Sequence, residues 1–171
     1  MSPIKAKMHP LDPITAEEIT QVSTLLKAKT SDKSLHFKLI TISEPPKSIL
    51  RPFLAAERNG STPSQIPRLA SALYYHRGTA DLFLAEVNLD TNSVHDVKKV
   101  DSHFHGQNDV DEMIQLRDAC LKHPKVLEEI KKFKLPDHLE MVCDTWPYGR
   151  DSDKQFPRYI QVRLHVAFTH P

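Results

Sequence analysis

The sequence predicts an α+β fold made of two small domains, each with a helix packed on a short antiparallel sheet. Two observations lead to this prediction. An amphipathic helical pattern is followed by several short strand-like runs joined by turns, and the same order then begins again in the second half of the chain. The composition agrees with it, because 171 residues with 39% hydrophobic and 26% charged side chains are enough to build a buried core.

We divide the chain into a first α+β domain at residues 1–100, a linker at residues 101–108 and a second α+β domain at residues 109–171. The second domain is expected to be incomplete, because its pattern contains a pair of helices but only two strands. A two-stranded sheet has open edges and is marginally stable by itself.

The first expected element is a helix over residues 15–29. Thr15 and Glu18 have the spacing of a capping box, in which each side chain bonds to the backbone N–H of the other residue. The apolar side chains that follow recur at helical spacing: Ile19, Val22, Leu25 and Leu26. Together these features predict a helix with one buried face.

Four strand-like runs complete the first domain. They are rich in β-branched, aromatic and other apolar residues and lie at 35–42, 69–75, 82–89 and 94–100. Pro45 and Pro46 end the first run, because proline has no N–H to donate to a neighbouring strand. Residues 59–67, which contain an Asn-Gly pair and two prolines, are typical of a loop.

The second domain repeats the pattern with fewer strands. Helical spacing predicts helices at 109–121 and at about 124–133, the second starting with Pro124, which suits a first helical turn. Strict alternation of apolar and polar residues predicts strands at 139–143 and 160–168. We therefore expect a helix pair on a two-stranded sheet.

Charge and motif content exclude several functions. Lys and Arg number 23 against 22 Asp and Glu, so the chain has no basic surface for nucleic acid or for an acidic membrane. No apolar run approaches the roughly 18 residues of a membrane-spanning helix, and no secretory signal is visible. The chain has four glycines and no phosphate-loop, dinucleotide or Gly-x-Ser-x-Gly motif, which argues against nucleotide binding and serine hydrolysis.

Two phrases carry a resemblance to a known family. Residues 9–19, His-Pro-Leu-Asp-Pro-Ile-Thr-Ala-Glu-Glu-Ile, resemble the opening of the copper-containing (topaquinone) primary amine oxidases. Residues 124–136 and the phrase Val-Cys-Asp-Thr-Trp-Pro-Tyr-Gly at 142–149 resemble the third amino-terminal domain of the same family. The turn at 44–47 also fits, so the resemblance covers about residues 9–160.

The resemblance implies a pair of small cystatin-like domains that precede a large catalytic β-sandwich. It also implies that the full-length protein is a homodimer with copper and topaquinone as cofactors. Such an enzyme oxidatively deaminates primary amines to aldehyde, ammonia and hydrogen peroxide. Since no secretory signal is visible, secretion is not expected. The cytoplasm and the peroxisome both stay open, because the resemblance implies a targeting signal at the carboxyl terminus of the full-length protein.

The sequence departs from the family at the cofactor. The family's topaquinone tyrosine lies in an Asn-Tyr-acid phrase, and none of the four tyrosines here has that context: Tyr74, Tyr75, Tyr148 and Tyr159. We therefore assign no catalytic and no cofactor-binding residue to this chain and expect it to be inactive alone. After Gln161 the resemblance stops, which we interpret as a truncated or misread gene product or a short relative. The alternative is a non-catalytic binding or dimer-supporting module.

His103 and His105 are the metal-ligand candidates of the sequence. A His-x-His pair on a strand would point both imidazoles to one side, with Asp101, Asp109 and Asp111 nearby to add oxygen ligands. The pair lies in the expected linker, however, far upstream of the family's copper site. We therefore interpret it as part of a solvated linker and predict no metal site.

Two further features have a structural and a chemical interpretation. Trp146 and the Pro-Tyr-Gly that follows it could form a ligand platform, but we favour a tryptophan that anchors a strand end by packing. Cys120 and His123 have the spacing of neighbours on a helix, as a nucleophile and its base would. Cys120 falls on the apolar stripe, so we favour an inert buried thiol in a reducing compartment, like Cys143.

Overall fold

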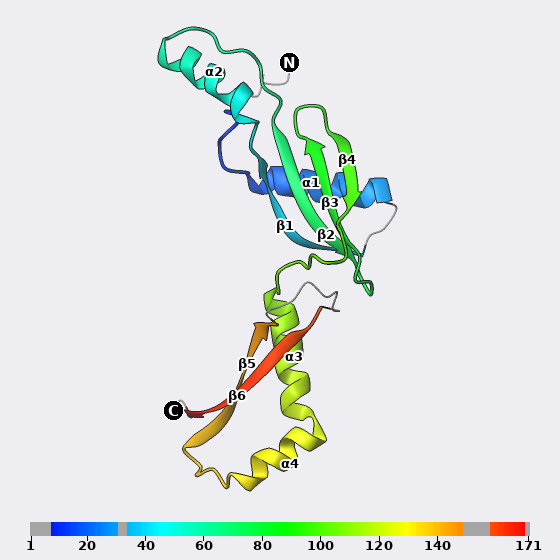
Figure 1. The fold of residues 1–171 in the computed structure, drawn as a ribbon, viewed down its shortest axis with the longest axis vertical. Helices are drawn as coiled ribbons and strands as arrows, with labels where there is room; N and C mark the ends of the chain where they lie inside the picture. Colours follow the sequence, from blue (N-terminus) through cyan, green and yellow to red (C-terminus); the bar gives the residue numbers. More distant parts are fainter. Residues whose placement is uncertain (1–7, 31–33, 149–157, 170–171) are drawn as a thin grey trace. The chain divides into compact units, whose positions relative to one another are not determined.

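The computed structural model describes residues 8–30, 34–148 and 158–169 (Figure 1). The chain divides into two compact units, which we call unit 1 (residues 1–106) and unit 2 (residues 107–171). The division falls within the stretch predicted as a linker. Each unit has an α+β fold in which helices pack on a small antiparallel sheet, as the sequence predicts.

Unit 1 has two helices and four strands in the described residues. In chain order they are α1 (Ala16–Thr30), β1 (Leu35–Ser43), α2 (Lys47–Arg58), β2 (Leu69–His76), β3 (Leu82–Asn88) and β4 (Ser93–Lys99). The four strands form one antiparallel sheet in the order β1-β2-β3-β4, and α1 crosses one face of it (Figure 1). The predicted helix and all four predicted strands of this domain are confirmed within one or two residues at each end.

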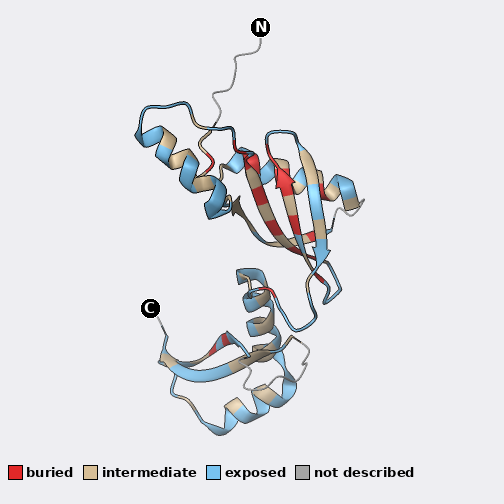
Figure 2. Cartoon of the chain, turned by 45° about the horizontal axis from the view of Figure 1, so that its top comes forward, coloured by how far each residue is buried: buried red, intermediate tan, exposed pale blue. Residues whose placement is uncertain are grey.

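The core of unit 1 lies between α1 and the two central strands. Val22 and Leu26 of α1 are fully buried against the sheet, where Ala70 and Ala72 of β2 let the helix approach closely. Figure 2 shows the buried residues concentrated in β2 and β3. Removing apolar surface from water stabilises a fold by about 25 cal/mol per Å². The burial of these apolar side chains is therefore the main stabilising contribution to unit 1.

Helix α2 was not predicted from the sequence. It follows Pro46 directly and contains Pro52, and prolines at both places obscured a helical pattern. The first turn forms because the N–H groups of Ile49 and Leu50 both bond to the carbonyl of Pro46. No residue of α2 is buried, so the helix contributes little to the core.

Unit 2 has a pair of helices and a two-stranded sheet in the described residues. Its elements are α3 (Val110–Lys122), α4 (Pro124–Lys132), β5 (Leu139–Pro147) and β6 (Ile160–Phe168). Asp109 caps α3 through a complete capping box with Glu112. Strand β5 is longer than predicted, because Trp146 and Pro147 continue the pairing with β6 instead of turning the chain.

The core of unit 2 is thin. Among its described residues, Cys143 and Thr145 of β5 are the buried ones, and neither α3 nor α4 contributes a buried residue. Large apolar side chains stay exposed, Phe168 at 74% being the most exposed of them. None of the helices in the described parts of the chain is long and apolar enough to cross a membrane.

Candidate functional site

The most enclosed charged group of the described residues is the ion pair of Arg68 and Glu18 in unit 1. Arg68, at 3% exposure, donates from Nε to Glu18 Oε1 at 2.6 Å and from Nη2 to Oε2 at 3.0 Å. Its guanidinium also donates to the backbone carbonyls of His9, Asp12 and Pro13. The hydrogen bond to Glu18 raises the pKa of Arg68, which keeps the cation charged.

This cluster ties three parts of unit 1 together. Glu18 also accepts from the backbone N–H of Thr15 and so completes the predicted capping box at the start of α1. The backbone of Arg68 itself donates to Asp90 Oδ2 and accepts from the N–H of Leu89 in the turn after β3. Because the guanidinium is closed in by protein acceptors, the cluster positions the chain and does not bind substrate.

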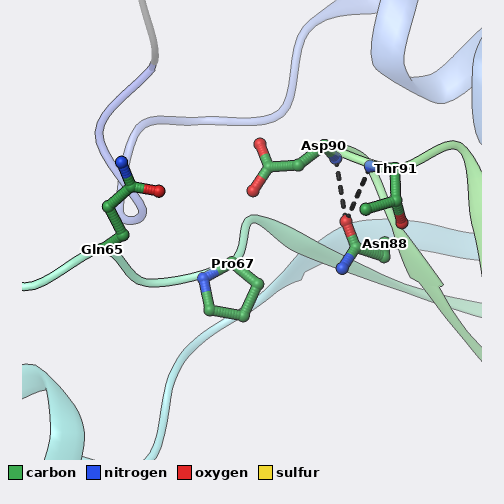
Figure 3. A pocket seen from close by; sticks show the side chains of 5 residues that line it. All are labelled: Gln65, Pro67, Asn88, Asp90 and Thr91. Atoms are coloured by element: carbon green, nitrogen blue, oxygen red, sulfur yellow. Dashed lines mark hydrogen bonds between the residues drawn. The ribbon is translucent and has the colours of Figure 1, made fainter.

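A surface hollow of about 440 Å³ lies beside this cluster (Figure 3). It is lined by Gln65, Pro67, Asn88, Asp90 and Thr91. Figure 3 shows that the amide oxygen of Asn88 accepts from the backbone N–H groups of Asp90 and Thr91. The polar groups of this lining therefore hold a turn, and the lining contains no nucleophile paired with a base.

The structure changes the geometry assumed for the His-x-His candidate. Residues 100–108 form no strand, so the alternation that would place His103 and His105 on one side does not apply. Asp101 accepts from the backbone N–H and the Nδ1 of His103, and these bonds lower the pKa of that carboxyl. The Asp101 carboxylate thus holds a turn through its bonds to His103. The Asp109 carboxylate caps α3 in the same way, by accepting from the backbone N–H of Glu112.

The four tyrosines divide between the two units, Tyr74 and Tyr75 in unit 1 and Tyr148 and Tyr159 in unit 2. Tyr74 is fully buried in the core of unit 1, and the hydroxyl of Tyr75 accepts from the backbone N–H of Gly106 at 2.7 Å. Tyr148 and Tyr159 meet edge to face across the end of the β5–β6 ladder, with ring centroids 6.0 Å apart.

The predicted packing role of Trp146 is wrong for this structure. The side chain is 53% exposed on β5, beside the exposed Tyr148 and Tyr159. The physical reason is the size of the sheet: two strands do not provide enough apolar surface to cover an indole ring. We call Trp146, Tyr148 and Tyr159 the aromatic group of unit 2.

The two cysteines lie together, which the sequence did not reveal. Cys120 on α3 is half-buried, and Cys143 on β5 is buried. Burial first, and then the neighbouring Cys120, raises the pKa of Cys143 to about 11. His123, the base considered for Cys120, is the residue that links α3 to α4.

Together these features define a class of protein: a tandem of small α+β domains whose polar clusters are structural. Comparison with known proteins agrees. The family model of the copper amine oxidase N2 domain matches residues 9–99, more than half of the chain. The chain belongs to the copper amine oxidase family.

Individual relatives extend the match into unit 2. Copper amine oxidase 1 of Aspergillus niger is 30% identical over 160 residues, covering 90% of this chain and 24% of the relative. A primary amine oxidase of Arthrobacter sp. (strain P1) is 30% identical over 143 residues, 82% of this chain and 20% of the relative. The chain thus spans about a quarter or less of these relatives.

A solved structure gives the same result. The copper-containing benzylamine oxidase from Hansenula polymorpha matches with a TM-score of 0.84 and 32% identity. The match covers 96% of this chain and 26% of that one. The likeness is therefore to an amino-terminal region of the family, and the amine oxidase fold class expected from the sequence is confirmed.

Proposed function

We propose that this chain is a non-catalytic amino-terminal region of a copper amine oxidase, and that amine oxidation takes place in sequence outside residues 1–171. One observation supports this most strongly: the main chemically capable side chains described above are engaged in holding the fold. Arg68 is closed by Glu18 and carbonyls, Asp101 and Asp109 hold a turn and a helix start, and Cys143 is buried beside Cys120.

Copper is the metal that the family name implies, and the predicted candidate pair, His103 and His105, does not form a centre for it. The His103–His105 pair lies outside the strands, and His103 is engaged by Asp101. We therefore assign no step of amine oxidation to this chain. In the proposal, copper, topaquinone, the homodimer and a primary amine substrate belong to the full-length protein.

The proposal is tested by copper loading and turnover. The purified chain is incubated with Cu²⁺ and desalted, the copper per chain is measured, and peroxide release is followed with methylamine and with benzylamine. We expect less than one copper per chain and no peroxide. A stoichiometric copper together with amine-dependent peroxide would contradict the proposal.

The role we propose for unit 2 is a packing surface for further parts of the longer protein. Strand β6 exposes Leu164, Val166 and Phe168, a run of apolar side chains that a self-contained domain would cover. In a product that continues past Pro171, amide exchange in β6 should slow relative to the 171-residue chain. Unchanged exchange in the longer product would contradict this role.

A binding or dimer-supporting module is the second candidate, favoured by the exposed aromatic group of unit 2. Aromatic side chains with a polar tip are enriched at interfaces. Sedimentation velocity of the chain over a range of concentrations tests this. Association that is lost in Trp146→Ser but kept in the matched surface variant Thr24→Ser would favour the module.

A further inference from the structure

Units 1 and 2 each contain an arginine that closes the start of their first helix. In unit 2, Arg158 donates from Nη1 to Glu112 Oε1 at 2.7 Å and from Nη2 to Glu112 Oε2 at 2.9 Å. Its Nη2 also donates to Asn108 Oδ1 at 2.8 Å and to the backbone carbonyl of Gln107 at 3.2 Å. Arg158 therefore binds Glu112 in the bidentate geometry of strong guanidinium–carboxylate pairs, and it also binds the two residues that lead into α3.

The places of this arginine and this glutamate in unit 2 match those of Arg68 and Glu18 in unit 1. Glu18 and Glu112 are each the third residue of their helix, and each accepts from the backbone N–H of the residue that caps it. Each arginine stands one or two residues before the second strand of its sheet. We call each arginine–glutamate pair, with the helix start that it holds, a clasp. The same clasp recurs at equivalent places in the two units.

The two clasps differ in how far water reaches them. In unit 1 the side chains of Arg68 and Glu18 are 3% and 9% exposed. In unit 2 those of Arg158 and Glu112 are 19% and 26% exposed. Dissolved ions screen a buried pair much less than a pair that solvent can reach. The clasp of unit 2 should therefore weaken as the ionic strength rises, whereas the clasp of unit 1 should not.

The clasp of unit 2 joins one end of the β5–β6 ladder to the start of α3. Beside Arg158, the carbonyl of Tyr159 accepts from the N–H of Tyr148, which extends the ladder beyond the pairing of Pro147 with Ile160. Strand β6 pairs with β5 in a sheet that has two strands among the described residues, and α3 packs on β5. Because the core of unit 2 is thin, little other packing holds this end of the ladder when the clasp opens.

We propose that the Arg158–Glu112 clasp is a salt-sensitive latch, which holds the beginning of β6 against the start of α3 and opens while the rest of the chain stays folded. Opening releases the cap of α3 and the adjoining end of the ladder together, because the same ion pair holds both. The clasp of unit 1 is its closed counterpart and stays shut over the same range of salt. The latch acts within unit 2 and is independent of the proposed function.

Amide exchange of the full chain, followed by NMR at constant pH, tests the latch. The reporter amides are those whose hydrogen bonds the clasp supports: Asp109 and Glu112 in the cap of α3, and Tyr148 in the ladder. Salt is raised from about 20 mM to about 500 mM NaCl, which shortens the Debye length from roughly 20 Å to roughly 4 Å. Exchange at the reporters should become about two- to fivefold faster. The matching amides of unit 1, Thr15 and Glu18, should keep their rates.

Three variants separate the latch from a general loss of stability. Arg158→Ala should raise exchange at the reporter amides by about tenfold at low salt and abolish its dependence on salt, since the latch is then open throughout. Arg158→Lys keeps the charge but loses the bidentate geometry, so it should lie between this variant and the wild type. The matched control is Arg163→Ala, which removes an exposed arginine from the middle of β6 and should behave as the wild type.

Several results would overturn the proposal. One is exchange at the reporters that does not respond to salt in the wild type, and another is a salt response that persists in Arg158→Ala. An equal response at Thr15 and Glu18 would mean that salt acts on the whole chain. If Arg158→Ala unfolds unit 2, Arg158→Lys decides, and exchange identical to the wild type in that variant would refute the latch.

Discussion

Units 1 and 2 begin with the same kind of element, a capped helix beside an antiparallel sheet, yet they differ in what the sheet can bury. Unit 1 has four strands and a core that includes Val22, Leu26 and Tyr74 at no exposure. Unit 2 has two strands among its described residues and leaves aromatic and aliphatic side chains in solvent. The comparison shows that helix capping and strand alternation specify local structure, whereas the number of strands decides whether a core closes.

The largest effect is expected at the ion pair of unit 1. Arg68→Ala leaves the Glu18 carboxylate buried and uncompensated, so it should lower the free energy of unfolding of unit 1 by about 3–5 kcal/mol. Urea unfolding followed by far-ultraviolet circular dichroism measures it. The matched control is Glu57→Gln, which removes the exposed pairing with His9 and should cost less than about 1 kcal/mol. Equal costs would mean that Arg68 does not organise unit 1.

A second pair of variants compares the same substitution in the two units. Leu26→Ala opens a cavity in the core of unit 1 and should cost about 2–5 kcal/mol. Leu164→Ala removes a side chain that is already 40% exposed on β6 and should cost less than about 1 kcal/mol. Urea unfolding is followed by circular dichroism for Leu26→Ala and by Trp146 fluorescence for Leu164→Ala. A larger loss of stability in Leu164→Ala than in Leu26→Ala would contradict the contrast between the two units.

The third prediction concerns pH and acts on unit 2. The pKa of Cys143 is raised from 9.0 to about 11 by burial and by Cys120, so the folded state holds a proton that the unfolded state has lost between these values. Stability is therefore unaffected below pH 9 and falls as the pH rises toward 11, by about 2 kcal/mol in total.

Trp146 fluorescence in urea, measured at pH 8 to 10.5 under reducing conditions, checks this dependence. Cys143→Ala is the control, because other groups also titrate in this range and their contribution remains in the variant. A pH dependence that is identical in the variant would show that the thiol does not cause it.

The smallest effects distinguish two adjacent tyrosines of β2. Tyr75→Phe removes the acceptor of the Gly106 N–H, so it should cost about 1–2 kcal/mol. The hydroxyl of Tyr74 is buried without a hydrogen-bond partner among the described residues, so Tyr74→Phe should be neutral or slightly stabilising. Urea midpoints of the two variants give the comparison, and a cost for Tyr74→Phe above that for Tyr75→Phe would refute it.

The sequence predicted the parts of this structure that depend on local patterns. The capping box of Thr15 and Glu18 and the alternation in β6 located their elements correctly, since both act within a few residues. The family resemblance also identified the fold, because the phrases at residues 9–19 and 142–149 occur in the order and at the separation expected of the family. The compartment, cytoplasm or peroxisome, stays a prediction.

Contacts between distant residues were not predictable in the same way. The partner of Glu18 is Arg68, 50 positions later, and no local pattern connects them. The effect of Cys120 on the pKa of Cys143 likewise depends on how α3 packs on β5. Trp146 was expected to pack, as large aromatic residues usually do, and it is exposed because the sheet beneath it has two strands.

Amide hydrogen exchange on the intact, reduced chain tests the central claim most directly. The claim is that unit 1 is stabilised by its own core and that unit 2 depends on surface from outside residues 1–171. The account predicts that amides in β2 and β3 exchange only through global unfolding of unit 1, while those in β5 and β6 exchange many times faster through local opening. Equal protection of the four strands would contradict it, because unit 2 would then be as self-sufficient as unit 1.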